Sequence, residues 1–200
     1  MKRLFLNSSI QLIKKNKQYT DEEIEIIQYG LEGIYLTLTK MIILFGLAYL
    51  LGIVKEFVLL LVSYNIIRSQ AFGIHATKSI YCLISSICLF IIGAILCKYI
   101  TLPFWFCISS AILCDICLFL YAPADTYKRP IVNPKKRKRF KIISLFLGII
   151  YTILIIVFHQ YFIVNYLVIG MIEAILMILP VTYHVFHLPY QNYKLYCSDV

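Results

Sequence analysis

The chain has 200 residues, of which 61% are hydrophobic and only 14% charged, and it carries a formal net charge of +9. Too few polar side chains are present to cover a soluble domain, so the composition indicates an all-α polytopic membrane protein. The positive charges flank apolar runs, as membrane topology requires, and this placement argues against a nucleic-acid partner.

Residues 1–33 combine spaced apolar positions with lysines and an acidic cluster. This pattern is typical of amphipathic helices that lie on the cytoplasmic surface of a membrane. The sequence Thr20-Asp21-Glu22-Glu23 resembles a capping box, so a helix is expected to begin near Asp21. Both an anchoring role and a part in substrate docking fit this region.

Apolar runs near the roughly 20-residue length that crosses a bilayer follow this region. We predict about six transmembrane helices, at 34–53, 55–70, 79–99, 103–122, 142–159 and 161–180. If the N-terminus lies inside, most Lys and Arg residues fall in cytoplasmic segments, and the outer turns hold only Lys55 and Lys98. The positive-inside rule therefore predicts an N-in/C-in domain over 34–180 and a cytoplasmic tail over 181–200.

The second apolar run is short, because its uncharged part from Phe57 to Ile67 makes only about 16 Å of helix. Either Lys55 and Arg68 extend their side chains toward the membrane surfaces, or the segment after the helix is recessed into the membrane. We favour the recessed segment, whose backbone polar groups then require partners from other helices.

The polar segment 68–82 interrupts the apolar runs and contains one histidine, His75, and one cysteine, Cys82. An imidazole next to a cysteine can accept the thiol proton and later return a proton to a leaving amine. On one unbroken helix the two residues would lie roughly 10.5 Å apart along the axis. We therefore expect His75 in a loop that folds back over the helix start bearing Cys82, where the helix dipole favours a thiolate. Gly73 provides freedom for this bend.

The segment resembles the motif of the accessory gene regulator B (AgrB) family, Arg-x-x-Ala-Gly-Gly-x-His-Ala-x-x-Ser-x-x-Cys. That family comprises membrane endopeptidases that process quorum-sensing propeptides in Gram-positive bacteria. Phe72 stands where the family often has its first glycine. The resemblance implies that Cys82 is the nucleophile and His75 the base and then the acid. The matching positions are Arg68, Ala71, Gly73, His75, Ala76, Ser79 and Cys82, of which Arg68, Gly73 and Ser79 are candidates for supporting the site.

The segment 122–141 also resembles the family, through a Pro-x-Asp-x-x-x-(Lys/Arg)-Pro pattern that begins at Pro123. By itself it indicates a cytoplasmic loop whose basic run fixes topology and contacts anionic lipid. Asp125 could orient the imidazole of His75, or it could serve as an ordinary cap or turn residue. The basic residues could attract the acidic tail of a substrate. They are Lys128, Arg129, Lys135, Lys136, Arg137, Lys138 and Arg139.

Three charged residues, Lys40, Asp115 and Glu173, fall within the predicted spans. They could line a polar pocket or substrate path, or one of the acids could pair with Lys40 or Arg68 to hold helices together. No cofactor is expected. A metal site is not expected either, because His184 and His187 have no second pair of ligands.

By its resemblance, the chain is expected to be a plasma-membrane cysteine endopeptidase with its site on the cytoplasmic side. The substrate would be an AgrD-like propeptide whose acidic C-terminal tail is released through an acyl-enzyme thioester, followed by closure of a thiolactone or lactone ring. Family members are thought to act as dimers, so the resemblance also makes a homodimer possible. The competing interpretation is a non-enzymatic small transporter or peptide-export chaperone with His75 and Asp115 on a proton or solute path. An intramembrane metalloprotease would require a His-Glu-x-x-His-like motif, which the sequence lacks.

Overall fold

A computed structural model of the chain describes residues 20–74, 79–126 and 130–196, together with Leu6, residues 8–11 and Ile13. The chain forms two units, Met1–Leu50 and Leu51–Val200. Throughout the described residues the regular structure is helical, and the one strand-like feature there is an isolated bridge between Phe72 and Ala124. The all-α class predicted from composition is thus confirmed.

The first unit is dominated by the helix α2 (Asp21–Leu50), which is 30 residues long. Its start has the predicted capping box. The Thr20 backbone N–H donates to Glu23 Oε2 at 2.9 Å, and the Glu23 backbone N–H donates to Thr20 Oγ1 at 3.3 Å. A helix of this length extends about 45 Å, which is long enough to cross a bilayer with residues to spare.

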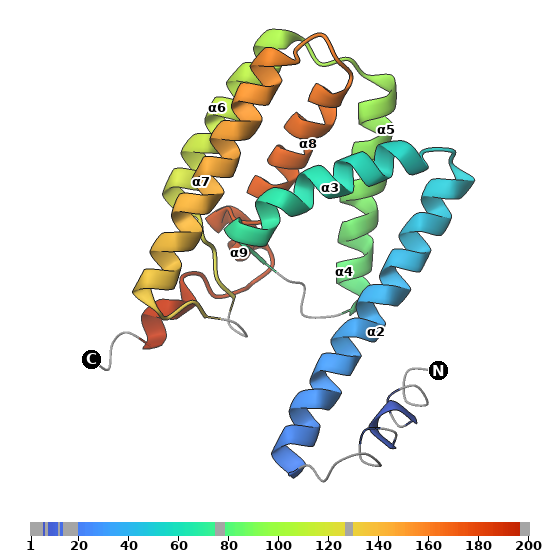
Figure 1. Ribbon diagram of the computed structural model, residues 1–200, viewed down its shortest axis with the longest axis vertical. Coiled ribbons are helices and arrows are strands. Elements are labelled where there is room, and N and C mark those ends of the chain that lie inside the picture. The colour runs from blue at the N-terminus through green and yellow to red at the C-terminus, as the bar shows by residue number, and fades with distance from the viewer. Residues whose placement is uncertain are drawn as a thin grey trace. The chain divides into compact units, whose positions relative to one another are not determined.

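The second unit is a bundle of helices linked by short turns. In Figure 1, α6 and α7 run side by side, α3 crosses the bundle, and α8 lies next to α3 and α6. The segments α4, η1 and α5 form one continuous helical run with a π-helical turn in its middle. The elements are α3 (Val54–Ala71), α4 (Ser79–Ser86), η1 (Ile87–Ile91), α5 (Ile92–Tyr99), α6 (Phe104–Tyr121), α7 (Pro134–Val157), α8 (Ile163–Leu176), α9 (Pro180–Val185) and the 3-10 helix η2 (Asn192–Tyr196).

Small residues allow the helices of this bundle to approach closely. A Cβ atom added at Gly170 of α8 would meet Ser63 Oγ of α3 at 2.6 Å. Next to this contact, the Tyr151 hydroxyl of α7 donates to the Ser63 carbonyl at 2.9 Å. Close backbone approach and interhelical hydrogen bonds are the usual means by which helices associate where lipid, rather than water, surrounds them.

Four of the described helical segments are long and apolar enough to cross a membrane. They are Glu23–Leu50, Ile80–Tyr99, Phe104–Tyr121 and Pro134–Val157. The apolar helix α8 is shorter, at 14 residues, and α3 contains Lys55, Glu56 and Arg68 within its 18 residues. The predicted count of about six spans and the N-in/C-in orientation therefore stay predictions, whereas a helical membrane protein is supported.

One helix boundary differs clearly from the sequence prediction. Helix α7 begins at Pro134, whereas the fifth span was predicted to begin at 142. The Asn133 side chain accepts hydrogen bonds from the backbone N–H groups of Lys135 and Lys136, and proline is favoured in a first turn. The basic run 135–139 is therefore part of a helix rather than of a loop.

Candidate active site

The segment that leads toward His75 leaves the end of α3 in a strained backbone conformation. Phe72 has a φ of 59° and Gly73 a φ of 113°. The Gly73 N–H donates to the Ala124 carbonyl at 2.7 Å, and the Ile74 N–H donates to the Met177 carbonyl at 3.0 Å. Residues 72–74 are thus held between the segment after α6 and the segment after α8.

Arg68 completes the hydrogen bonding of this segment from the last turn of α3. Its Nη1 donates to the Phe72 carbonyl and its Nη2 donates to the Ile74 carbonyl. The planar guanidinium can serve both oxygens at once, which a lysine ammonium on a flexible stem cannot do with the same geometry. Backbone groups of the segment are therefore covered by protein, as a recessed loop requires.

Cys82 lies near the start of α4, as predicted from the sequence, and its side chain is half-buried. The backbone N–H groups of a first helical turn have no partner within the helix, and their partial positive charge favours an anion nearby. A charge on the Cys82 sulfur would also interact with the Arg68 guanidinium. Arg68 in turn lies over the Tyr64 ring, 6.0 Å from its centroid.

Several of the predicted site residues lie outside the described residues. They are His75, Lys128 and Arg129, and of Ser79 only the backbone is described. The encounter between His75 and Cys82 therefore stays a prediction. The structure places the chain on either side of His75, with Ile74 fixed at Met177 and with Cys82 at the start of α4.

Asp125 is buried, with 2% of its surface exposed. Its Oδ2 accepts a hydrogen bond from the Tyr193 backbone N–H at 2.8 Å, and its Oδ1 lies 3.9 Å from Arg137 Nη1. The carboxylate thus has partners in α7 and in the C-terminal segment. Its predicted role in orienting His75 stays a prediction.

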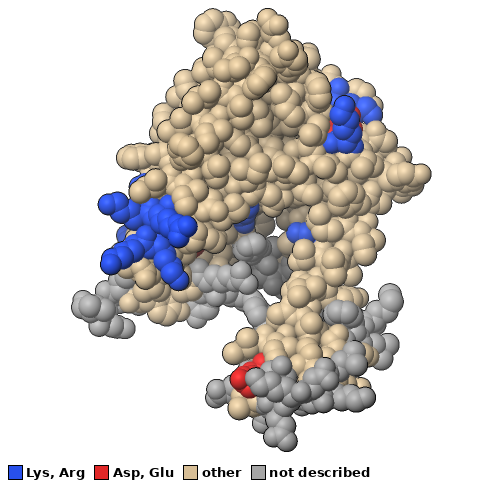
Figure 2. Space-filling view, in the orientation of Figure 1, with Lys and Arg blue, Asp and Glu red and all other residues tan. Residues whose placement is uncertain are grey.

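The basic residues at the start of α7 form a dense cluster on the surface in Figure 2. Lys135, Lys136, Lys138 and Arg139 are exposed there. Arg137 differs from them, because its guanidinium lies 3.6 Å from the centroid of the Tyr193 ring and faces Asp125. Among the described members of the run, Arg137 therefore has an internal role.

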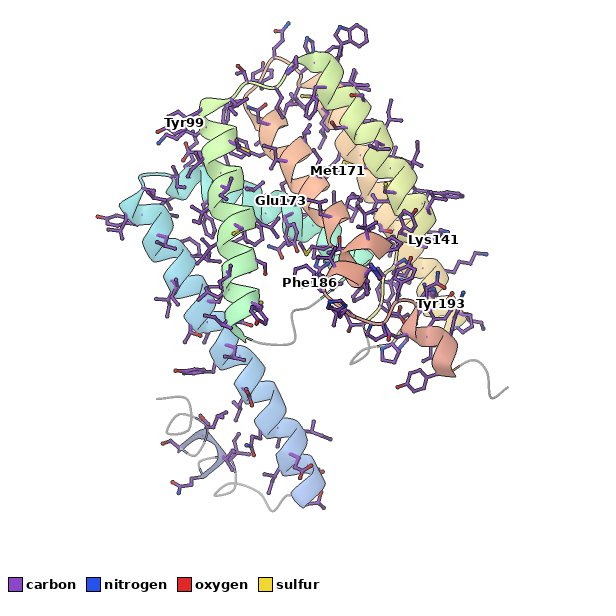
Figure 3. The ribbon with its side chains drawn as sticks, turned by 180° about the vertical axis from the view of Figure 1, so that it is seen from behind. Tyr99, Lys141, Met171, Glu173, Phe186 and Tyr193 are labelled. Atoms are coloured by element: carbon purple, nitrogen blue, oxygen red, sulfur yellow. The ribbon has the colours of Figure 1, made fainter. Side chains whose placement is uncertain are left out.

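The acids predicted within the spans are not paired with Arg68 in the described part of the chain. Asp115 Oδ2 accepts a hydrogen bond from Thr152 Oγ1 at 2.7 Å. Glu173 is 5% exposed and lies in the bundle interior, where a Cβ atom at Gly93 of α5 would touch its Oε1 (Figure 3). An ion pair of Arg68 with either acid is thus not observed, because Arg68 contacts backbone carbonyls instead.

Comparison with known proteins identifies the family. The model of the accessory gene regulator B family matches residues 6–179. The chain belongs to the accessory gene regulator B family. An AgrB-like protein of Clostridium acetobutylicum is 34% identical over 183 residues, which cover 90% of this chain and 88% of that protein. An AgrB-like protein of Listeria innocua is 28% identical over 186 residues, which cover 92% of this chain and 91% of that protein.

The accessory gene regulator protein B of Staphylococcus carnosus is 36% identical over 122 residues, or 61% of this chain and 63% of that protein. No solved structure matches the chain. AgrB family membership confirms the resemblance seen in the sequence and implies a role in the accessory gene regulator quorum-sensing system. It also links the chain to an AgrD propeptide and, with the apolar helices, indicates a membrane protein.

Three residues outside the AgrB motif contact the segment 72–74 or Asp125, and the sequence did not indicate them. Ala124 and Met177 accept hydrogen bonds through their backbone carbonyls. Tyr193 donates its backbone N–H to Asp125, and its ring packs against Arg137. Any residue type can accept a hydrogen bond through its backbone carbonyl, so the sequence contains no signal for the roles of Ala124 and Met177. Tyr193 had a weak one, because it follows Tyr183 and Tyr190 in a segment predicted to be a cytoplasmic tail, where fewer large aromatic side chains are expected.

Proposed function

We propose that this AgrB family member is a membrane cysteine endopeptidase that removes the C-terminal tail of an AgrD-like propeptide. The observation that carries the proposal is the position of Arg68. It holds the carbonyls of the segment before His75 and lies within electrostatic reach of the Cys82 sulfur. A positive charge that interacts with a cysteine at a helix start favours the thiolate, which is the nucleophilic form of the side chain.

In the proposed reaction the Cys82 thiolate attacks the carbonyl carbon of the scissile peptide bond. The carbon–nitrogen bond then breaks, and the departing amine receives a proton from the His75 imidazolium. This step leaves the central part of the propeptide as a thioester on Cys82 and releases the acidic tail. The thioester conserves the energy of the broken peptide bond in a form that a second nucleophile can use.

Ring closure follows when a thiol or hydroxyl of the bound peptide attacks the thioester carbonyl. His75, neutral after the first step, accepts the proton of the attacking thiol or hydroxyl. The new thiolactone or lactone bond forms as the carbon–sulfur bond to Cys82 breaks, and Cys82 is regenerated as a thiolate. Water would compete with this attack and hydrolyse the thioester. A segment whose backbone groups are already covered by Arg68, Ala124 and Met177 supports exclusion of water from this site.

The experiment co-expresses the chain with its propeptide in membranes and measures release of the acidic tail. We expect Cys82→Ala and His75→Ala each to abolish release without changing the amount of chain in the membrane. Cys88→Ala is the matched control, because Cys88 lies farther along the same helical run and is exposed. This control variant is expected to cleave at the wild-type rate.

Tail release by Cys82→Ala would contradict the proposal. Peptide movement that persists in Cys82→Ala and depends on a proton gradient would instead support the transporter or peptide-export interpretation.

A further inference from the structure

The C-terminal segment after α9 returns to the buried residue Asp125. The Asn192 side-chain Nδ2 donates to the Asp125 carbonyl at 3.4 Å, and the Tyr193 backbone N–H donates to Asp125 Oδ2 at 2.8 Å. The Tyr183 hydroxyl also donates to the Asp125 carbonyl, at 3.0 Å. Asn192 and Tyr183 are each 1% exposed, so these contacts lie inside the protein rather than on a solvated tail.

Arg137 holds the same segment from the side of α7. Its guanidinium lies 3.6 Å from the centroid of the Tyr193 ring, and its Nη1 lies 3.9 Å from Asp125 Oδ1. Figure 3 shows Tyr193 on the 3-10 helix η2 next to the start of α7. A stacked guanidinium that also faces a carboxylate is a geometry that lysine does not reproduce.

Asp125 is linked through its neighbour Ala124 to the segment that precedes His75. Its neighbour Ala124 accepts a hydrogen bond from the Gly73 N–H at 2.7 Å, and the Ala124 N–H donates to the Ala71 carbonyl at 2.9 Å. Any displacement of Asp125 therefore moves the backbone partner of Gly73. The chain of contacts runs from the C-terminal segment, through residues 124–125, to Ala71 and Gly73.

We infer that residues 183–193 form a clamp that positions the segment 72–74, and that Asn192, Tyr193 and Tyr183 are positioning residues for the reaction. This inference rests on the proposed function. All three contact Asp125, and they act through Asp125 and its neighbour Ala124. Small displacements of a catalytic group lower a rate strongly, because the reacting atoms must meet in a narrow range of geometry.

Burial raises the pKa of the Tyr183 phenol, so its hydroxyl remains protonated and able to donate at working pH. The clamp is therefore expected to hold across the neutral range. The hold of the clamp on Asp125 should depend on the Asn192 amide and the Tyr183 hydroxyl, and each of these donors can be removed separately.

The test uses Asn192→Leu, which keeps side-chain volume but removes the amide donors, and Tyr183→Phe, which removes only a hydroxyl. Full-length chain in membrane vesicles is treated with iodoacetamide, and alkylation of the Cys82 peptide is followed by mass spectrometry. A cysteine depends on a well-placed base for its reactivity at about pH 7 more than at about pH 9, where a thiol ionises more readily without one. We therefore expect the ratio of the alkylation rate at about pH 7 to that at about pH 9 to fall roughly fivefold in Asn192→Leu and roughly threefold in Tyr183→Phe. The kcat for tail release should fall about tenfold in Asn192→Leu while KM changes less than about twofold.

Lys194→Ala is the matched control, because Lys194 is exposed on the same 3-10 helix and, among the described residues, its hydrogen bond runs from its backbone N–H to the Gln191 carbonyl. It is expected to match wild type in both measurements. If Asn192→Leu is absent from membranes, Tyr183→Phe decides the question. Alkylation ratios in the inserted variants that equal wild type would overturn the clamp, whatever the cleavage assay gives. Absence of tail release by wild type would overturn the proposed function instead, and the alkylation comparison would still test the clamp.

Discussion

At the scale of single residues, Arg68 and Gly73 depend on each other. Gly73 has a φ of 113°, and a Cβ atom added there would collide with Arg68 Nη1 and with the Met177 carbonyl oxygen. The absence of a side chain is what allows the guanidinium to reach past Gly73 to the carbonyls on either side of it. Glycine is therefore required at this position both for backbone conformation and for space.

We expect Gly73→Ala to reduce tail release at least about a hundredfold, because the clash displaces Arg68 and the segment before His75. Gly52→Ala is the matched control. Gly52 also has a positive φ, of 63°, but an added Cβ atom there meets nothing within 4 Å. The Gly52→Ala variant should lose roughly 1 kcal/mol of stability from backbone strain and retain its activity. The measurement is the rate of tail release per inserted chain, and equal rates for the two variants would contradict this account.

The sequence indicated Arg68, Gly73 and Cys82 as candidate site residues because motif spacing is a local property. It could not reveal what Arg68 binds, since its acceptors are backbone carbonyls brought into place by a bend at Phe72. The partners of that bend, Ala124 and Met177, lie far along the chain. Contacts of this kind depend on tertiary packing, which the composition of a short segment does not encode.

At the scale of elements, helices were predicted where apolar runs occur, and boundaries were predicted less well. The Thr20 capping box gave the start of α2 correctly, because its signal lies in adjacent residues. The start of α7 was missed although Asn133 and Pro134 form an equally local signal. Five consecutive basic residues suggested a loop, but most of their side chains are exposed on a helix that continues into the apolar run.

The packing of α3, α5 and α8 has a test at Gly93. A Cβ atom there would meet Glu173 Oε1 and, at 2.7 Å, Leu60 Cδ2. We expect Gly93→Ala to destabilise the chain by about 1–3 kcal/mol, as overpacking of a close interface does. Gly46→Ala on α2, where an added Cβ meets nothing within 4 Å, should be neutral or slightly stabilising.

Thermal unfolding in detergent measures these differences. Because part of the clash at Gly93 involves the Glu173 carboxyl, Gly93→Ala should cost less in a Glu173→Ala background than in wild type. If the loss of stability in the double variant equals the sum of the losses in the two single variants, Glu173 does not fill the space at Gly93.

At the scale of the whole second unit, basic residues gather at opposite ends of the helices. Lys55 lies in the first turn of α3 and Lys98 in the last turn of α5, where the Lys98 Nζ donates to the Gly52 carbonyl at 2.9 Å. The cluster at the start of α7 lies at the other end (Figure 2). Arg137 of this cluster faces Asp125, whose neighbour Ala124 is the backbone partner of Gly73. This separation agrees with the distribution from which the N-in/C-in orientation was predicted, and it places the larger cluster near the candidate site.

The cluster at the start of α7 is expected to have two separable roles. The exposed Lys135, Lys136 and Lys138 can attract an acidic substrate tail over a distance, so replacing all three by Gln should raise KM roughly tenfold at low ionic strength and leave kcat unchanged. Added salt should reduce the difference from wild type, because it screens exposed charges.

Arg137→Gln should behave in the opposite way. Its guanidinium faces Asp125 and the Tyr193 ring, so its loss should lower kcat, change KM little and respond weakly to salt. Lys138→Gln is the single-residue control for the removal of one positive charge from the same helix turn. Steady-state kinetics of tail release at low and high salt distinguish the two roles. If Arg137→Gln and Lys138→Gln raise KM equally and lose that effect in salt, Arg137 is simply another member of the surface cluster.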